Sequence, residues 1–195
     1  NGDRTIWITY NGEIYNYLEI RQVLIDKGYV FVSSSDTEVI IHAYEEWGEN
    51  CVKKFNGMWA FALVDLRKKF MFCSRDRFGV KPFYYYYDKE HFVFGSEIKQ
   101  LFCFPFIDPK ANERAIYEYL AFSAVDYCEE TFFCNINKLM QGHSLFIDLD
   151  TGDLKIQKYY NPEFCINNDI SYDEAVISFR NLFIDSVRLR LRSDV

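Results

Sequence analysis

The spacing of hydrophobic and polar residues over the first thirty positions predicts a strand followed by a helix. The β-branched and aromatic run Thr5–Tyr10 is typical of a strand, and Asn11-Gly12 behind it predicts a tight turn. Residues 14–27 then have helical spacing, and Gly28 is a suitable C-terminal stop. The apolar face of this helix is expected to comprise Leu18, Val23, Leu24 and Ile25.

A second helix is predicted between residues 35 and 48. Tyr29–Val32 before it is short and rich in β-formers, which favours a strand. Ser35-Asp36-Thr37-Glu38 has the Ser-x-x-Glu form of a capping box, in which the serine and the glutamate satisfy free backbone N–H groups reciprocally. Apolar residues continue at helical spacing up to Gly48.

After Asn56-Gly57 the pattern changes to short strands. Met58–Val64 is continuously apolar, as expected for a strand buried on both faces. Asp150-Thr151-Gly152-Asp153 between two apolar runs predicts a hairpin. Other strands are expected at 70–73, 83–87, 91–94, 144–149 and 154–159, and helices at 97–102 and 112–122. Helices at both ends with hairpin strands between them indicate an α+β fold of sandwiched layers.

The last thirty-five residues differ from the rest. Asn161-Pro162 breaks the pattern, and Ser171 with Glu174 begins an amphipathic segment. Residues 187–192 alternate, which fits a helix end or a strand. We therefore predict one domain over residues 1–160, followed at 161–195 by a linker and the first helix of a second domain.

Composition excludes several classes of function. The net charge of −7 and a pI near 5.0 argue against nucleic-acid binding, which needs a basic face to neutralise phosphates. No apolar run approaches the roughly 20 residues of a membrane span, and no signal peptide is present. The six cysteines have no Cys-x-x-Cys spacing. We expect reduced, structural thiols in a cytoplasmic protein, with no metal site.

Asn11-Gly12 is the first candidate for catalytic chemistry. Attack on a carboxamide places negative charge on its oxygen, and each N–H donor held towards that oxygen contributes about 3–4 kcal/mol. A carboxamide side chain and a glycine N–H at a strand end supply two such donors, and glycine lets the backbone approach the substrate closely. The alternative is an ordinary Asn-Gly turn, which would be the preferred interpretation of an isolated dipeptide.

Asp36 also has two interpretations. At the first position of a helix a carboxylate stabilises free N–H groups and needs no further role. As a ligand it would accept the α-ammonium group of an amino-acid substrate. The two roles are compatible, because Ser35 can cap the helix while Asp36 points into a pocket.

Other chemistry is weakly represented. None of His42, His91 and His143 lies in a metal-ligand pattern, and His42 is expected to be a packed or surface residue. No Gly-x-Ser-x-Gly elbow or phosphate-binding glycine loop is present. The run Arg75-Asp76-Arg77 is interpreted as a structural group of ion pairs.

Five motifs together resemble glutamine-hydrolysing asparagine synthetase, whose glutaminase domain is a class II, N-terminal-nucleophile glutamine amidotransferase. The resemblance covers about residues 1–195 in one order, in the strings Tyr10-Asn11-Gly12-Glu13-Ile14-Tyr15-Asn16, Ser35-Asp36-Thr37-Glu38-Val39-Ile40, Phe55-Asn56-Gly57-Met58-Trp59-Ala60-Phe61-Ala62, Arg75-Asp76-Arg77-Phe78-Gly79-Val80-Lys81-Pro82 and Gly95-Ser96-Glu97-Ile98-Lys99. The Asn-Gly and Ser-Asp-Thr-Glu elements also occur in hexosamine-forming and purine-pathway amidotransferases.

The resemblance implies a four-layer αββα sandwich of the N-terminal-nucleophile hydrolase type, here without its first strands. It implies that Asn11 and Gly12 form the oxyanion hole, that Asp36 holds the α-ammonium of glutamine, and that Glu13 lines the same pocket. The nucleophile of the family is a terminal cysteine, expected upstream of Asn11, whereas this chain begins with Asn1. We therefore expect these residues alone to be inactive.

The resemblance further implies the reaction of the complete enzyme. The cysteine thiolate would form a glutamyl thioester, water would release glutamate, and ammonia would pass to the enzyme's own synthetase domain. There Mg-ATP would adenylate aspartate and ammonia would displace AMP, giving asparagine. Residues 192–195 resemble the approach to the pyrophosphate loop of that domain. No cofactor is expected in the glutaminase domain, and a homodimer is implied.

Two alternatives remain open. A related amidotransferase could deliver ammonia to another acceptor, such as a sugar or peptide intermediate in surface-polymer synthesis. A homologue could also retain the fold as a non-catalytic scaffold, since a fold can outlast its chemistry.

Overall fold

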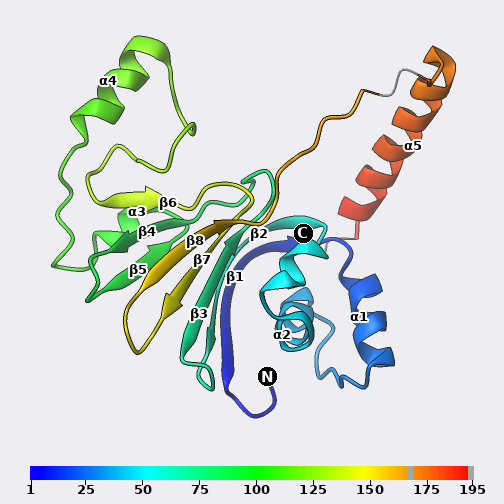
Figure 1. The fold of residues 1–195 in the computed structure, drawn as a ribbon, viewed down its shortest axis with the longest axis horizontal. Helices are drawn as coiled ribbons and strands as arrows, with labels where there is room; N and C mark the ends of the chain where they lie inside the picture. Colours follow the sequence, from blue (N-terminus) through cyan, green and yellow to red (C-terminus); the bar gives the residue numbers. More distant parts are fainter. Residues whose placement is uncertain (167–168, 193–195) are drawn as a thin grey trace.

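Residues 1–166 and 169–192, which the computed structural model describes, form eight strands, five α-helices and one 3₁₀ helix (Figure 1). The strands are β1 (Ile6–Ile14), β2 (Gly57–Asp65), β3 (Phe70–Arg75), β4 (Tyr84–Tyr87), β5 (Phe92–Gly95), β6 (Ile136–Lys138), β7 (His143–Asp148) and β8 (Leu154–Lys158). The helices are α1 (Tyr17–Asp26), α2 (Asp36–Trp47), the 3₁₀ helix η1 (Gly48–Lys53), α3 (Ile98–Leu101), α4 (Glu113–Phe122) and α5 (Tyr172–Arg190).

The strands form two antiparallel sheets. The larger has the order β1-β2-β3-β7-β8, and the smaller has the order β5-β4-β6. The predicted hairpin at residues 150–153 joins β7 to β8, with Ile147 opposite Leu154. β2 is the apolar strand predicted at residues 58–64, and its side chains are buried on both faces from Trp59 to Leu63.

Three hydrophobic cores hold the layers together. α1 and α2 cover one face of the larger sheet, where Leu24 and Ile40 pack with Phe61 and Phe72 and all four are fully buried or nearly so. A second core lies between the sheets, formed by Ala60, Ala62, Cys73, Phe83, Tyr85, Leu139, Leu145 and Ile147. A third, formed by Leu101, Ile107 and Ile136, joins α3 to the outer face of the smaller sheet. Each fully buried large apolar side chain contributes about 1.5–3 kcal/mol.

These cores define an αββα arrangement, so the predicted four-layer α+β fold is confirmed. The short β6 was missed, because three residues carry too little pattern to predict a strand. Among the described residues, no helix has the length and apolar content needed to cross a membrane.

Three local predictions are wrong. Asn11 and Gly12 do not form a turn, because β1 continues through them and pairs with β2 over nine residues. Residues 29–32 form no strand. In the predicted apolar face of α1 only Leu24 is buried, while Leu18, Val23 and Ile25 are 44–47% exposed. Ile20 takes their place in the core because the helix is rotated about its axis relative to the expected face.

The loop before α2 is stabilised by the helix itself. Ser35 caps α2 by accepting a hydrogen bond from the Glu38 N–H at 3.4 Å. The Glu38 carboxylate does not complete the capping box. It accepts instead from the backbone N–H groups of Val32 and Ser33, at 2.8 and 2.6 Å. Those N–H groups are thereby satisfied without a strand partner.

The Arg75-Asp76-Arg77 run is not a group of ion pairs among its own members in the part of the chain that is described. Asp76 is 1% exposed, and its carboxylate accepts from the backbone N–H groups of Phe78, Val80 and Lys81, each at 3.0 Å. The Arg75 guanidinium donates to three carbonyl oxygens of the loops that flank this site. The run therefore organises backbone, which corrects the ion-pair interpretation.

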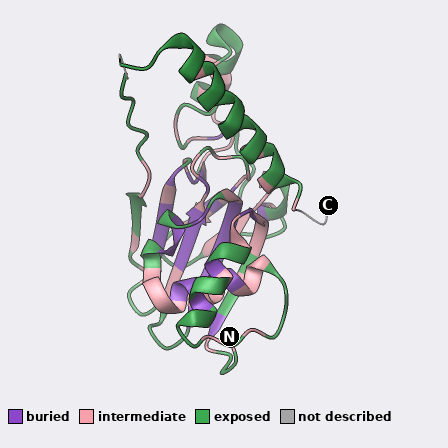
Figure 2. Cartoon of the chain, turned by 90° about the vertical axis from the view of Figure 1, so that its right-hand side faces the viewer, coloured by how far each residue is buried: buried purple, intermediate pink, exposed green. Residues whose placement is uncertain are grey.

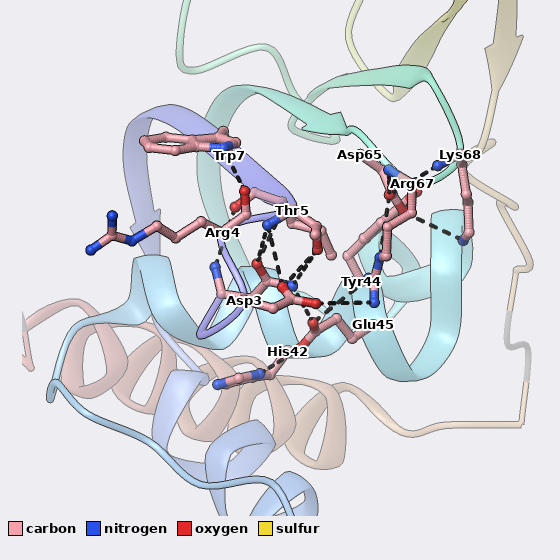
Figure 3. Close-up of polar contacts among 12 residues, drawn as sticks. Asp3, Arg4, Thr5, Trp7, His42, Tyr44, Glu45, Asp65, Arg67 and Lys68 are labelled. Atoms are coloured by element: carbon pink, nitrogen blue, oxygen red, sulfur yellow. Dashed lines mark hydrogen bonds and ion pairs between the residues drawn. The ribbon is translucent and has the colours of Figure 1, made fainter.

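A cluster of polar side chains connects the start of β1 to α2 (Figure 3). Figure 3 shows Glu45 beside His42 and facing Arg67. The Glu45 carboxylate lies 2.7 Å from His42 Nδ1 and 3.9 Å from an Arg67 nitrogen, and Arg67 also lies 3.8 Å from Asp3. The His42 ring packs against Tyr29 and Phe31, so of the two predicted placements, packed or on the surface, the packed one is found.

α4 and α5 project from the sandwich and have no buried residues (Figure 2). α5 begins where the amphipathic segment was predicted, with a capping box formed by Ser171 and Glu174, and it remains helical to Arg190. Its C-terminal end contacts α1, where Arg192 pairs with Glu19 at 2.6 Å. The predicted approach to a pyrophosphate loop lies mostly outside the described residues, which end at Arg192.

Candidate active site

Gly12 lies where β1 and β2 approach too closely for a side chain. It pairs with Trp59 and has a φ of 155°, a conformation that L side chains rarely adopt. A Cβ at this position would lie 2.7 Å from the Trp59 Cα and would overlap the Met58 carbonyl oxygen. Only glycine therefore fits here without a movement of the backbone.

The Gly12 N–H points to the outer edge of β1, away from β2. Trp59, the residue opposite, uses its own N–H and C=O on the other side, where both bind Asp76. Gly12 and Trp59 are thus a pair without hydrogen bonds between them, and in such a pair the N–H groups face outward. β1 is an edge strand of the described sheet, so this donor is not used by a neighbouring strand.

Asp36 lies along the same edge. Its Oδ2 accepts hydrogen bonds from the Ile14 N–H at 2.9 Å and from the Tyr10 hydroxyl at 2.8 Å. Ile14 and Gly12 are two residues apart, so their N–H groups point in the same direction about 7 Å apart. The first residue of α2 is therefore held one strand repeat from the Gly12 donor.

Tyr10 is partly buried on the helix side of β1, and its pKa is raised well above its usual value by this burial and then by the Asp36 carboxylate. The hydroxyl consequently remains protonated and donates to Asp36 at neutral pH. This contact leaves carboxylate lone pairs free, because an ionised aspartate has about four acceptor positions.

Asn11 faces the space between the two sheets. Side chains alternate along β1, so Ile8 and Tyr10 pack towards the helices while Thr9 and Asn11 point to the other face. The Asn11 carboxamide Nδ2 donates to Ser96 Oγ at 3.1 Å. A cleft of about 380 Å³ opens here, lined by Thr9, Tyr10, Asn11, Ala60, Phe61, Ala62, Pro82, Phe83, Phe94, Gly95, Ser96, Gln100 and Phe104.

Glu13 is half-buried and follows Gly12 on the Asn11 face of β1. Burial is the main cause of the raised pKa of Tyr10 and of Tyr15, and the charge of Glu13 adds to the rise at both. The site thus combines amide donors at the centre of β1 with two carboxylates beside them.

Comparison with known protein families agrees with this geometry. Residues 1–160 match the family described as the glutamine amidotransferase domain. The chain belongs to this family.

Curated relatives of this glutamine amidotransferase domain are asparagine synthetases. The chain is 41% identical over 97% of its length to "Putative asparagine synthetase [glutamine-hydrolyzing] 2" of Methanocaldococcus jannaschii, and covers 36% of that protein. It is 38% identical over 98% of its length to "Asparagine synthetase [glutamine-hydrolyzing] 3" of Bacillus subtilis, and covers 31% of it. The chain therefore spans about a third of the length of these relatives.

Solved structures share the fold at lower identity. Glutamine phosphoribosylpyrophosphate amidotransferase of B. subtilis, complexed with ADP and GMP, superposes with a TM-score of 0.52 at 19% identity, over 80% of this chain and 29% of that one. A structure described as the allosteric regulatory enzyme of purine biosynthesis gives 0.53 at 18% identity, over 80% and 28%. These matches support the αββα sandwich fold.

The candidate site includes two residues to which the sequence analysis gave no role. Tyr10 supports Asp36, and Ser96 contacts Asn11. Both occur within the motifs that carry the family resemblance, and that is the signal by which they could have been found. What the motifs do not contain is the pairing itself, since Asn11 and Ser96 lie 85 positions apart in the sequence.

The described residues place no cysteine in the lining of the cleft and no group of metal-ligand side chains anywhere. The six cysteines are unpaired, and none is among the residues that line the cleft. Burial raises the pKa of the Cys51 thiol to about 12, which keeps it protonated and unreactive at neutral pH. No group of three His, Cys, Asp or Glu residues suitable for a metal ion occurs within residues 1–166 and 169–192.

Proposed function

We propose that this glutamine amidotransferase domain binds glutamine at the edge of β1 and stabilises the oxyanion formed when the carboxamide is attacked. The observation that carries the proposal is the outward-facing N–H of Gly12, with the Asn11 carboxamide beside it and the Asp36 carboxylate one strand repeat away. Two donors and one anion at this spacing suit the carboxamide oxygen and the α-ammonium of one amino acid.

Each group has a separate task in the proposed reaction. A cysteine thiolate that is not one of the six in these residues attacks the carboxamide carbon, and the electron pair of the C=O bond moves to oxygen. Asn11 Nδ2 and the Gly12 N–H stabilise that oxygen. The pair then returns from oxygen to re-form the C=O bond as the C–N bond breaks, and the nitrogen takes up the proton that the thiol had lost and leaves as ammonia. Water hydrolyses the resulting thioester to glutamate. Asp36 holds the α-ammonium, and Glu13 lines the same pocket.

We further propose that the ammonia is used to make asparagine. The relatives named as glutamine-hydrolysing asparagine synthetases support aspartate as the acceptor of the ammonia. In this scheme Mg-ATP and aspartate react in a synthetase domain of the same protein, which functions as a homodimer in the cytoplasm. Residues 161–195 would then be the linker and first helix of that domain. The exposed apolar side chains of α5, including Phe179, Leu182 and Phe183, fit a helix that another domain covers.

The 195 residues alone are proposed to be inactive. Cys51 and Cys73 are buried, and the other four cysteines lie outside the cleft lining. Ammonia released from glutamine by these residues above a protein-free blank, and abolished by a thiol-blocking glutamine analogue, would contradict this.

The test of the whole proposal uses the full-length protein with glutamine, aspartate and Mg-ATP. Glutamate, asparagine and AMP are quantified by mass spectrometry. Asparagine and AMP rising together would support the proposed reaction. Glutamate without asparagine would retain glutamine hydrolysis and indicate another acceptor. No turnover of any substrate would overturn the proposal in favour of a non-catalytic scaffold.

A further inference from the structure

Ser96 joins the two sheets at the candidate active site. Asn11 belongs to the edge strand of the larger sheet, and Ser96 follows the edge strand β5 of the smaller one. The hydrogen bond from Asn11 Nδ2 to Ser96 Oγ, 3.1 Å long, therefore crosses the cleft between the sheets. It is a contact between the proposed oxyanion donor and a residue with no assigned role.

The contact settles the orientation of the Asn11 carboxamide. Rotation of an asparagine amide about χ2 is broad and weakly restricted, so an unsupported amide would point its donors in many directions. The NH₂ group carries two hydrogens. With one of them donated to Ser96, the amide plane is fixed and the second hydrogen is available to a ligand in the cleft.

Ser96 is itself held by the turn into α3. Glu97 caps this helix with Gln100 in a reciprocal capping box, and the Glu97 N–H donates to Gln100 Oε1 at 3.1 Å. Gly95, the residue before Ser96, packs closely against this box. A Cβ at Gly95 would lie 2.6 Å from the same Oε1 and 3.2 Å from Leu101 Cδ1. Leu101 is fully buried in the core behind the smaller sheet. The backbone position of Ser96 is thus set by the capping box and by the core behind it.

We infer that Ser96 is a positioning residue for glutamine hydrolysis, acting only through Asn11. It pre-orients one oxyanion donor so that no reorganisation is needed when negative charge develops. This inference rests on the proposed glutamine hydrolysis and adds to it a residue from the second sheet.

The direct test is glutamine hydrolysis by the full-length protein and its Ser96→Ala variant. Losing one hydrogen bond that acts only in the transition state should lower kcat about 10-fold and leave KM for glutamine nearly unchanged. Ser96→Thr retains the hydroxyl and should recover most of kcat. Ser178→Ala, an exposed serine of α5, is the matched control and should equal wild type.

A double-mutant cycle distinguishes positioning from general structural support. If Ser96 acts through Asn11, Ser96→Ala should have no further effect on kcat in an Asn11→Ala background. If the fold-losses in kcat of the two single variants multiply in the double variant, the inference is overturned. A wild-type kcat in Ser96→Ala would also overturn it. An equal loss of kcat in Ser96→Ala and Ser96→Thr, with a lowered Tm in both, would also overturn it by indicating a packing role. Inactivity of the wild-type protein would instead overturn the proposed function itself.

Discussion

The Asp36 carboxylate accepts a hydrogen bond from the Ile14 backbone N–H at 2.9 Å, which ties the first turn of α2 to the free edge of β1. The contact places a charge from one motif beside the amide donors of another. It also explains how a residue at a helix start serves two roles. The helix is capped by Ser35, so the Asp36 side chain is free to leave the helix end.

Asp36→Asn should weaken glutamine binding more than it weakens chemistry. The amide retains an acceptor for Ile14 and Tyr10 but loses the charge proposed to hold the α-ammonium. A hydrogen bond to a charged group contributes about 1.5–3 kcal/mol, so KM for glutamine should rise by roughly 10- to 150-fold with a small change in kcat. Steady-state kinetics of the full-length protein measure this. Asp26→Asn, on the exposed end of α1, is the control.

A fall in kcat at unchanged KM in Asp36→Asn would place the charge in the chemical step and contradict its proposed binding role.

Gly12→Ala should damage stability and activity together. The added Cβ meets the backbone of Met58 and Trp59, so the two strands must separate, at a cost of about 1–3 kcal/mol. Separation also moves the Gly12 N–H away from the substrate, and hydrolysis should fall at least 100-fold. Thermal unfolding and glutamine turnover are the measurements. Gly2→Ala is the control, because nothing lies within 4 Å of a Cβ there. Full activity in Gly12→Ala would refute the oxyanion assignment.

Asp76→Ala should destabilise the fold through its loop, without a direct part in chemistry. The change leaves the N–H groups of residues 78, 80 and 81 without their acceptor in a site that is almost fully buried. A loss of about 3 kcal/mol in the free energy of unfolding is expected. Denaturant titration measures it, with Asp150→Ala as an exposed control whose side chain pairs with Lys69. Equal midpoints for the two variants would show that the loop is organised by other contacts.

The fold should lose stability as the pH rises above 10. Burial raises the pKa of Tyr85 to about 12, and burial with the Asp36 carboxylate raises that of Tyr10 further. The unfolded chain releases these phenolic protons near pH 10, whereas the folded chain retains them. The unfolded state then binds fewer protons, so the unfolding free energy falls between pH 10 and the folded pKa. Tm measured from pH 8 to 11 should decline less steeply in Tyr85→Phe than in wild type. Parallel declines would show that Tyr85 ionises normally in the fold.

The extent of sequence prediction differs between the fold and the site. Periodicity was sufficient for β2, where Trp59–Leu63 is apolar without interruption, and for the helix after Ser35, whose cap is encoded locally. It failed at Asn11-Gly12, because a local turn preference was overridden by pairing with β2 along the whole of β1. Local patterns do not include the partner strand, so no window around Asn11 could have predicted this.

The site divides in the same way. The motifs identified Asn11, Gly12 and Asp36 as candidates. Asn11 and Gly12 lie in the C-terminal half of β1, and Asp36 contacts Ile14 at its end. The motifs did not indicate that Asn11 faces the second sheet while Tyr10, which contacts Asp36, faces the helices. Those directions follow from the alternation of side chains along β1 in the assembled sandwich. Ser96 depends on a contact across both sheets, and such a contact has no local signature.

The end of α5 should bind the sandwich in a salt-dependent manner. Arg192 pairs with Glu19 at 2.6 Å, and the Arg190 guanidinium lies 4.9 Å from the centre of the Tyr15 ring, directly after the Asn11–Ile14 segment. The exposed ion pair contributes up to about 1 kcal/mol and is screened by salt. The contact of Arg190 with the buried Tyr15 ring contributes about 0.5–2 kcal/mol. Hydrogen exchange at residues 172–190 should therefore accelerate on going from low to high salt. Arg192→Glu should produce the same acceleration at low salt, and Glu19→Arg combined with it should restore protection by reversing the pair. An exchange rate that changes neither with salt nor with the charge reversal would show that α5 is held by contacts other than these two.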